Sequence, residues 1–277
     1  MKYTSPNYIK QVLKENGFSP LKRFGQNFLI DENIVKKIAD ISEAKEANII
    51  EIGPGLGALS SHLLVEAKKL VAIEIDNGFS AFLKEEFSDR NNFKIINIDI
   101  LEVDLEKLCK DEFGDEPIVL AANLPYYITS ACIMKFLKAN INIERIVVMV
   151  QKEVAKRICA KPGTSDYGSL SAIVSFFCKP KIDIVVSGNC FLPKPDIDSA
   201  VVSMEINKSK EIEADKFIDF VRSCFAMKRK TLLNNLKKVG YDREEILKAL
   251  IKIEIKENAR AEELSENMFI ELIKILT

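Results

Sequence analysis

The sequence has no tryptophan and only one histidine, His62, among its 277 residues. A single histidine cannot build a metal site of several imidazoles, and any histidine-dependent nucleophilic triad would have to use it. The six cysteines contain no C-x-x-C pair, and their spacings match no zinc motif. We therefore expect buried, reduced thiols and no bound metal, and composition alone removes several reaction classes.

Long apolar runs and an excess of either charge are also missing. No apolar stretch approaches the ~20 residues of a membrane span, and the first ten residues, MKYTSPNYIK, lack the apolar core of a signal peptide. We therefore expect a cytoplasmic protein with no membrane partner. Lys and Arg number 40 against 41 Asp and Glu, a net charge of −1, which excludes a uniformly basic coat but not a local basic face.

The chain does contain an alternation of strand and helix patterns. Short β-branched runs, with helical patterns between them, occur at residues 48–52, 70–75, 93–98, 118–122 and 146–150. This alternation predicts an α/β fold whose mostly parallel sheet is covered by helices on both faces. Two later runs, 182–186 and 200–206, are separated by a proline-rich loop and predict a closing pair with an antiparallel member. We therefore expect seven strands.

Strand patterns stop near residue 207. Beyond it, Phe217, Phe220, Val221, Cys224 and Phe225 recur at the spacing of an amphipathic helix, and further helical runs follow. We place a domain boundary in the polar stretch NKSKE. Residues 1–207 are predicted to form the α/β domain, and residues 208–277 a small all-α domain.

A glycine-rich loop follows the first predicted strand, in the sequence E-I-G-P-G-L-G. Gly53 and Gly55 allow the backbone to approach a nucleotide-like ligand and then turn into a helix. An ordinary glycine-rich turn would give the same pattern. Position 58 is alanine where the G-x-G-x-x-G pattern has its last glycine, which disfavours a nicotinamide cofactor.

Acidic residues mark the ends of the next two strands. Glu74 stands 21 residues after Gly53, where an acid can accept hydrogen bonds from ribose hydroxyls, and Asp76 is the competing candidate. Asp99 ends the third strand and can accept from an adenine amino group. Because the carboxyl ends of parallel strands share one edge of the sheet, these positions together predict an adenosine-containing cofactor.

The fourth strand ends in Asn123-Leu124-Pro125-Tyr126. An exocyclic adenine amine is a poor nucleophile because its lone pair is delocalised into the ring. The Asn123 side-chain oxygen and the Leu124 carbonyl can each accept one N–H, which favours a pyramidal nitrogen, while Pro125 fixes the backbone. Tyr126 offers an aromatic face for a flipped base. The alternative is a proline turn with a core tyrosine.

These segments together resemble the ribosomal RNA adenine dimethyltransferases, in particular the type that modifies the small ribosomal subunit. The resemblance runs from about residue 20 to the C-terminus. Its motifs, in chain order, are KRFGQNFL, EIGPGLG, NLPY, QKEV, YGSLS, LPKPDIDSAVV and MKRKT. It implies a class I, Rossmann-like S-adenosylmethionine methyltransferase fold with an added C-terminal helical domain.

The resemblance also assigns site residues. It implies contacts with S-adenosylmethionine by Asn27, Leu29, Gly53, Glu74, Asp99 and Asn123, to which the glycine pattern adds Gly55. It places the target adenine against Asn123, Leu124, Pro125, Tyr126 and Phe191. Leu29 is nominated by the resemblance alone. Phe191 opens the loop FLPKP, where an aromatic residue that anchors the loop in the core is the alternative.

The activity implied is dimethylation of N6 on two adjacent adenosines in the 3′-terminal hairpin loop of 16S rRNA, in the 30S subunit, by a monomer. Erm-type enzymes, which methylate 23S rRNA, are the nearest alternative. Three features favour the small-subunit type over the Erm type: Pro54 and Leu56 in the glycine loop, NLPY rather than NIPY, and a KRKT segment that we expect on a helix. A non-catalytic ribosome assembly factor and a DNA adenine methyltransferase are further alternatives, which NLPY and KRKT respectively disfavour.

Positive charge is concentrated in residues 222–238. The segment contains Arg222, Lys228, Arg229, Lys230, Lys237 and Lys238, and no acid. Solvated helix faces normally interleave both signs of charge, so a segment of one sign favours contacts with phosphates. We assign RNA binding to Arg222, Lys228, Arg229 and Lys230. Such contacts would position the RNA rather than read its bases.

Overall fold

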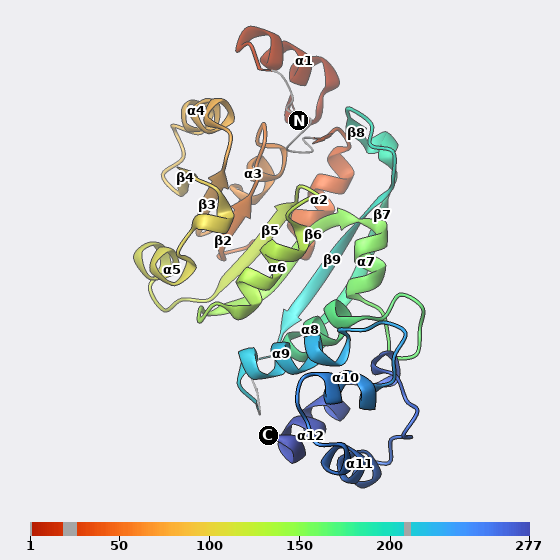
Figure 1. Ribbon diagram of the computed structural model, residues 1–277. Coiled ribbons are helices and arrows are strands. Elements are labelled where there is room, and N and C mark those ends of the chain that lie inside the picture. The colour runs from red at the N-terminus through yellow and green to blue at the C-terminus, as the bar shows by residue number, and fades with distance from the viewer. Residues whose placement is uncertain (1, 19–26, 208–211) are drawn as a thin grey trace. The chain divides into compact units, whose positions relative to one another are not determined.

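The computed structural model describes residues 2–18, 27–207 and 212–277 (Figure 1). Residues 22–26 of the KRFGQNFL motif and residues 208–211 of the predicted boundary lie outside this range. The chain forms two compact units, which are described separately. The first comprises Met1–Ala155 and Lys181–Ile206, and the second comprises Lys156–Pro180 and Asn207–Thr277.

The first unit is built on a seven-stranded sheet with the order β4-β3-β2-β5-β6-β9-β7. Its strands are β2 (Asn48–Ile52), β3 (Lys69–Glu74), β4 (Phe93–Asn97), β5 (Ile118–Asn123), β6 (Ile143–Gln151), β7 (Cys178–Val186) and β9 (Ser199–Ile206). Neighbouring strands from β4 to β6 are parallel, and β9 runs antiparallel to β6. The predicted fold class, with its antiparallel closing member, is confirmed.

Helices cover the sheet because its central strands are apolar on both sides. On one face, α2 (Glu32–Ile41), α3 (Ala58–Leu63) and α4 (Asn77–Glu86) pack buried side chains against β2, β3 and β6. The crossovers that lead to β5 and β6 contain α5 (Leu105–Phe113) and α6 (Thr129–Lys138), and α6 lies across the sheet in Figure 1. Asp31 caps α2, as its position before an apolar helical pattern predicts.

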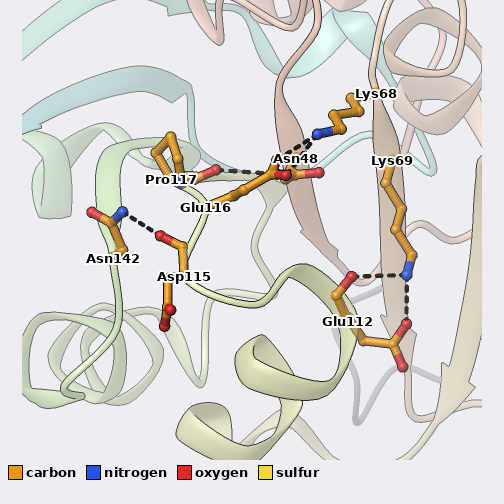
Figure 2. A network of polar contacts seen from close by, with 8 residues as sticks. All are labelled: Asn48, Lys68, Lys69, Glu112, Asp115, Glu116, Pro117 and Asn142. Carbon is orange, nitrogen blue, oxygen red and sulfur yellow. Dashed lines mark hydrogen bonds and ion pairs between the residues drawn. The ribbon is translucent and has the colours of Figure 1, made fainter.

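A polar network ties together the amino ends of the central strands (Figure 2). Asn48, the first residue of β2, donates to Glu116 at 2.8 Å, and Lys68 donates to the same carboxylate at 2.6 Å. Lys69, the first residue of β3, donates to the carboxylate and the carbonyl of Glu112, both at 2.9 Å. The exposed pairs add little stability individually, but the network aligns the strand starts and so the edge where the strands end.

Two short strands form a separate antiparallel pair that sequence patterns do not predict. β1 (Phe28–Leu29) pairs with β8 (Phe191–Leu192), and Leu29 lies opposite Phe191. Two residues are too few to show a strand periodicity. This pairing joins Phe28 and Leu29, at the end of the KRFGQNFL motif, to the proline-rich loop, although more than 160 residues separate them in the sequence.

The N-terminal segment packs beside this pair. After a short 3-10 helix η1 (Lys2–Thr4), α1 (Pro6–Glu15) begins at the cap residue Ser5. Ile9 and Val12 of α1 join a buried cluster with Phe28, Leu56 and Phe79. The helix thus closes apolar surface next to the glycine loop.

The second unit is helical. After α7 (Lys152–Ile158), it contains α8 (Ser169–Phe177), α9 (Ala214–Cys224), α10 (Leu232–Lys238), α11 (Arg243–Lys252) and α12 (Glu266–Leu276). Phe176 stacks on Phe217 with ring centroids 3.9 Å apart and an interplanar angle of 10°. Phe269 packs edge-on against Phe217. No helix in the described part of the chain has the length and apolar character needed to cross a bilayer.

The second unit begins earlier in the chain than the boundary predicted at residue 207. Lys156–Pro180 belongs to it, although it lies between β6 and β7 in sequence. The reason is the apolar helix α8, whose Phe176 buries its ring on α9. A short apolar run does not reveal which distant partner will cover it.

Gly57 provides a test of packing at the start of α3. Its φ is +85°, and an added Cβ would lie 2.9 Å from Leu83 and 3.0 Å from Phe87. Left-handed strain and overpacking should together lower the free energy of unfolding of Gly57→Ala by about 2–4 kcal/mol, measured by urea denaturation. Gly17→Ala is the control, because Gly17 has a φ of +64° with nothing within 4 Å. Equal destabilisation of the two variants would show that packing around Gly57 adds nothing to the decrease in the free energy of unfolding.

Candidate active site

A cavity opens at the carboxyl edge of the sheet, between the ends of β2 to β5 and the β1–β8 pair. It contains about 1150 Å³ of empty space, part of it open to solvent. Every residue predicted for the cofactor and the target base lines it: Asn27, Leu29, Gly53, Gly55, Glu74, Asp99, Asn123, Leu124, Pro125, Tyr126 and Phe191. The structure therefore brings into one cavity positions that span most of the first unit.

The glycine loop forms one wall of the cavity. Gly53 and Gly55 have φ values of +62° and +58°, which favour glycine. A Cβ on Gly53 would meet Pro125 at 3.8 Å, and one on Gly55 would meet Phe28 at 3.6 Å. The backbone itself thus faces the cavity between the NLPY segment and β1. This cradle suits a ligand that approaches main-chain atoms closely.

Glu74 is a buried acceptor at the end of β3, and the residue is only 4% exposed. Its carboxylate accepts from the N–H of Gly55 at 3.3 Å and from that of Asp76 at 2.9 Å. Burial raises the pKa of Glu74 to about 7 despite these hydrogen bonds. A carboxyl group held in this way suits ribose hydroxyls, which would replace the water it has lost.

Asp76, the competing candidate, has a different task. Its carboxylate accepts from the N–H groups of Gly78 and Phe79 at 2.9 and 3.1 Å, and so caps α4. It does not line the cavity. The geometry thus favours Glu74 as the ribose acceptor.

Asp99 stands where β4 ends and the chain turns into a 3-10 helix, Ile100–Glu102. One of its carboxylate oxygens accepts from the N–H of Leu101 at 2.8 Å, which caps this turn. The half-buried side chain lines the cavity beyond Glu74. This arrangement is compatible with an adenine amino group as a further donor.

Glu51 and Tyr127 are among the cavity residues that were not predicted from the sequence. Glu51 is 1% exposed, accepts from the Ser60 hydroxyl at 2.6 Å, and has a pKa that burial raises to about 8. Its signal was a carboxyl group between isoleucines in a predicted strand. Tyr127 is 56% exposed at the cavity and burial of part of its ring raises its pKa; its signal was the doubled tyrosine after NLP.

The side chain of Asn123 is held from across the cavity. Its amide nitrogen donates to the carbonyl of Asn27 at 3.4 Å. In this orientation the amide oxygen is the atom left to accept. Leu124 is 1% exposed, and its N–H donates to the carbonyl of Met149 on β6. Its own carbonyl is therefore the backbone group that can accept a hydrogen bond from a ligand in the cavity.

The rest of the NLPY segment is fixed by one backbone N–H and by side-chain hydroxyls. The carbonyl of Pro125 accepts from Ile128 N–H at 3.2 Å and from the Thr129 hydroxyl at 3.3 Å. The hydroxyls of Tyr126 and Ser199 are hydrogen-bonded at 2.9 Å. This hydrogen bond ties the aromatic ring to the first residue of β9, which limits its rotation.

Phe191 lies on β8 and is 3% exposed. It belongs to the main hydrophobic cluster and also lines the cavity. Its surroundings are therefore compatible both with the predicted contact with the target adenine and with the alternative, an aromatic residue that anchors the loop in the core. Across the residues that the structure describes, no group of three or more His, Cys, Asp or Glu is placed to hold a metal ion.

The four residues predicted to bind RNA all lie in the second unit. Arg222 is exposed in the last turn of α9, with Asp219 at 4.0 Å. Lys228, Arg229 and Lys230 are exposed as well. The prediction that the KRKT segment lies on a helix is wrong: the three cations form a turn, and Thr231 is the cap at which α10 begins. The hydroxyl oxygen of Thr231 accepts from a backbone N–H of the first helical turn, which has no acceptor within the helix. The helix therefore begins only after the three cations.

The whole chain resembles proteins of known families. A family model described as Ribosomal RNA adenine dimethylase matches residues 17–277. The Ribosomal RNA small subunit methyltransferase A of Clostridioides difficile (strain 630) is 42% identical and is matched over 99% of this chain and 96% of that protein. The protein of the same name from Geobacillus sp. (strain WCH70) is 44% identical over 84% of this chain and 81% of that protein.

Solved structures agree. A dimethyladenosine transferase from Plasmodium falciparum has a TM-score of 0.74 and 28% identity, over 88% of this chain and 95% of that chain. The 23S rRNA methyltransferase ErmE has a TM-score of 0.70 and 25% identity, over 90% and 99%. The match of the family model to nearly the whole chain, together with these relatives, establishes that the chain belongs to the ribosomal RNA adenine dimethylase family.

Proposed function

We propose that this protein dimethylates N6 of two adjacent adenosines in the 3′-terminal hairpin loop of 16S rRNA, in the 30S subunit, and that it acts as a cytoplasmic monomer. As a family member it is an rRNA adenine dimethyltransferase that depends on S-adenosylmethionine. The observation that carries the site assignment is the Asn123 amide, which Asn27 orients in the same cavity as Glu74.

The cavity residues fit the cofactor. Glu74 would accept from the ribose hydroxyls, Asp99 from the adenine amino group, and the Gly53 and Gly55 backbone would lie against the ligand. When bound, S-adenosylmethionine supplies a methyl group on a sulfonium ion, an electrophile whose leaving group is a neutral thioether. The protein therefore needs no metal and no covalent intermediate for this reaction.

The contribution of the chain to the rate is positioning. The Asn123 oxygen and the Leu124 carbonyl would accept the two N–H groups of the target amine, which localises its lone pair. Tyr126, tied to Ser199, would stack on the flipped base together with Phe191. Holding the amine in the attacking geometry removes most of the entropic barrier.

The substrate assignment can be tested with undermethylated 30S subunits. We expect a mass increase of two methyl groups on each of two adjacent adenosines in 16S rRNA, and none on 23S rRNA or DNA. Methylation of 23S rRNA instead would make this an Erm-type enzyme. Absence of any transfer, with subunit binding retained, would indicate an assembly factor.

Asn123→Ala should slow methyl transfer by about 10²–10³, because it removes one preorganised acceptor from the transition state. Single-turnover methylation of 30S subunits at saturating cofactor measures this rate. The decrease in cofactor affinity should be much smaller. Asn142→Ala is the control, since this side chain binds the Asp115 carbonyl at the opposite end of the sheet (Figure 2). A rate for Asn123→Ala within a few-fold of wild type would contradict the assignment.

Glu74 should make cofactor binding depend on pH. Since burial places its pKa near 7, the carboxyl takes up a proton as pH falls from 8 to 6 and loses one acceptor for ribose. Affinity for S-adenosylmethionine should therefore fall about tenfold over this range. Calorimetry on Glu74→Gln should show weaker binding at pH 8, by roughly 10- to 150-fold, and a flatter profile than wild type. Asp76→Asn, which keeps a cap residue and the N–H that Glu74 accepts, should still bind in a pH-dependent way, but with the midpoint at a lower pH, because the charge of Asp76 helps to raise the pKa of Glu74.

Replacement of Lys228, Arg229 and Lys230 by Gln should weaken binding to 30S subunits. The slope of log affinity against log salt should fall by about 0.7–0.9 for each phosphate that the variant no longer binds, while cofactor affinity stays the same. Gln at Lys248, Lys252 and Lys256 removes equal charge from exposed positions elsewhere in the second unit. If the slope falls equally in both triple variants, the effect reflects net charge and not phosphate binding by the turn.

A further inference from the structure

The three cations lie on a turn that is held by one buried side chain. We define the basic turn as Met227–Lys230, between α9 and α10. Beneath it, Asn235 of α10 is 2% exposed. Its amide oxygen accepts from the Met227 N–H at 2.8 Å, and its amide nitrogen donates to the Met227 carbonyl at 3.3 Å. One side chain thus satisfies the backbone donor and the backbone acceptor of the first residue of the turn.

The same carbonyl also closes the turn. Lys230 N–H donates to the Met227 carbonyl at 3.0 Å, so this oxygen receives two hydrogen bonds. At the far end, the Thr231 hydroxyl accepts from Asn234 N–H, and Leu232 N–H donates to the Ala259 carbonyl at 2.9 Å. The backbone on either side of the cations is therefore held in one conformation.

The cations themselves have no such restraint. Lys228, Arg229 and Lys230 are exposed, and within the described ranges none of them forms an ion pair. Three consecutive like charges repel one another, so nothing in their own chemistry favours a single compact arrangement. The order of this surface comes from the backbone beneath it.

A neutral amide is the side chain that this position requires. An aspartate could accept from the Met227 N–H but could not donate to its carbonyl, and its charge would attract the cations away from solvent. An apolar residue would leave both backbone groups of Met227 without their partner, which is costly near a buried site. Asn235 satisfies both groups and adds no charge.

We propose that Asn235 is a positioning residue for RNA binding, which holds the basic turn in the conformation that contacts RNA phosphates without touching the RNA itself. The inference rests on the proposed role of the turn in binding rRNA. Preorganisation raises affinity because the bound conformation need not be ordered at the moment of binding.

The first test compares Asn235→Ala with Asn234→Ala in the full-length protein. Asn234 is the exposed neighbour on the same helix, so its replacement controls for helix propensity. We expect Asn235→Ala to bind undermethylated 30S subunits about 5- to 30-fold more weakly with a reduced salt slope, and Asn234→Ala to match wild type. Affinity for S-adenosylmethionine should be unchanged in both. Wild-type subunit affinity for Asn235→Ala would overturn the inference.

A double-mutant cycle separates positioning from general stability. Asn235→Ala is combined with Gln at Lys228, Arg229 and Lys230. If Asn235 acts through the cations, its replacement should cause little further decrease in subunit affinity in this background. An equal decrease in both backgrounds would overturn the inference. If the Gln variant alone binds as tightly as wild type, the proposed RNA-binding role of the turn fails first, independently of Asn235.

Asn235→Asp serves where the alanine variant does not fold, since it keeps the size of the side chain and the acceptor for Met227 N–H. We expect its subunit affinity and salt slope to fall in the same direction. Amide hydrogen exchange of the basic turn should become faster in this variant, while α11 and α12 remain as protected as in wild type. Unchanged exchange at Met227 and Lys230 would mean that the amide does not hold the turn.

Discussion

The parallel pairing of β2 with β5 is the interaction on which the candidate site depends. Its register places Ile52 opposite Ala122, so Gly53, which follows β2, and Asn123, the last residue of β5, both come next at this edge of the sheet. A shift of one residue would turn every side chain of a strand to the other face. The glycine loop and the NLPY segment are therefore neighbours because of backbone hydrogen bonds within the sheet, and as a consequence a Cβ added to Gly53 would lie 3.8 Å from Pro125.

Carboxyl groups at the two edges of the sheet have different partners and opposite pKa shifts. At the amino edge, Glu112 and Glu116 are paired with lysines. Burial raises the pKa of Glu112, but hydrogen bonds from lysines outweigh it, and a hydrogen bond from Lys68 lowers the pKa of Glu116. At the carboxyl edge, Glu51 and Glu74 are buried with raised pKa values, and among the described residues they accept from a hydroxyl and from backbone N–H groups rather than from lysines. Paired charges suit a structural boundary, whereas a desolvated carboxyl group is compensated further when a ligand supplies donors.

The second unit uses buried polarity for a similar purpose. Tyr167 donates from its buried hydroxyl to the Leu264 carbonyl at 2.8 Å, and Asn235 binds both backbone groups of Met227. Around them the core is aromatic, with Phe176, Phe217 and Phe269 in contact. The apolar rings supply most of the burial, while a few amides and hydroxyls determine the conformation of the segments between helices.

Local patterns in the sequence were enough to determine the α/β class, the strand positions, the Asp31 cap and the acids at the strand ends, since these follow from periodicity and from parallel strands sharing an edge. Tertiary structure alone decided that Glu74 and not Asp76 faces the cavity, that β1 pairs with β8, that Lys156–Pro180 joins the helical unit, and that the KRKT cations lie on a turn. Each of these depends on a partner distant in sequence or, for Glu74 and Asp76, on which of two nearby carboxylates caps the following helix. Neither hydrophobic period nor residue type carries that information, because hydrogen bonds and packing partners are selected only when the segments meet.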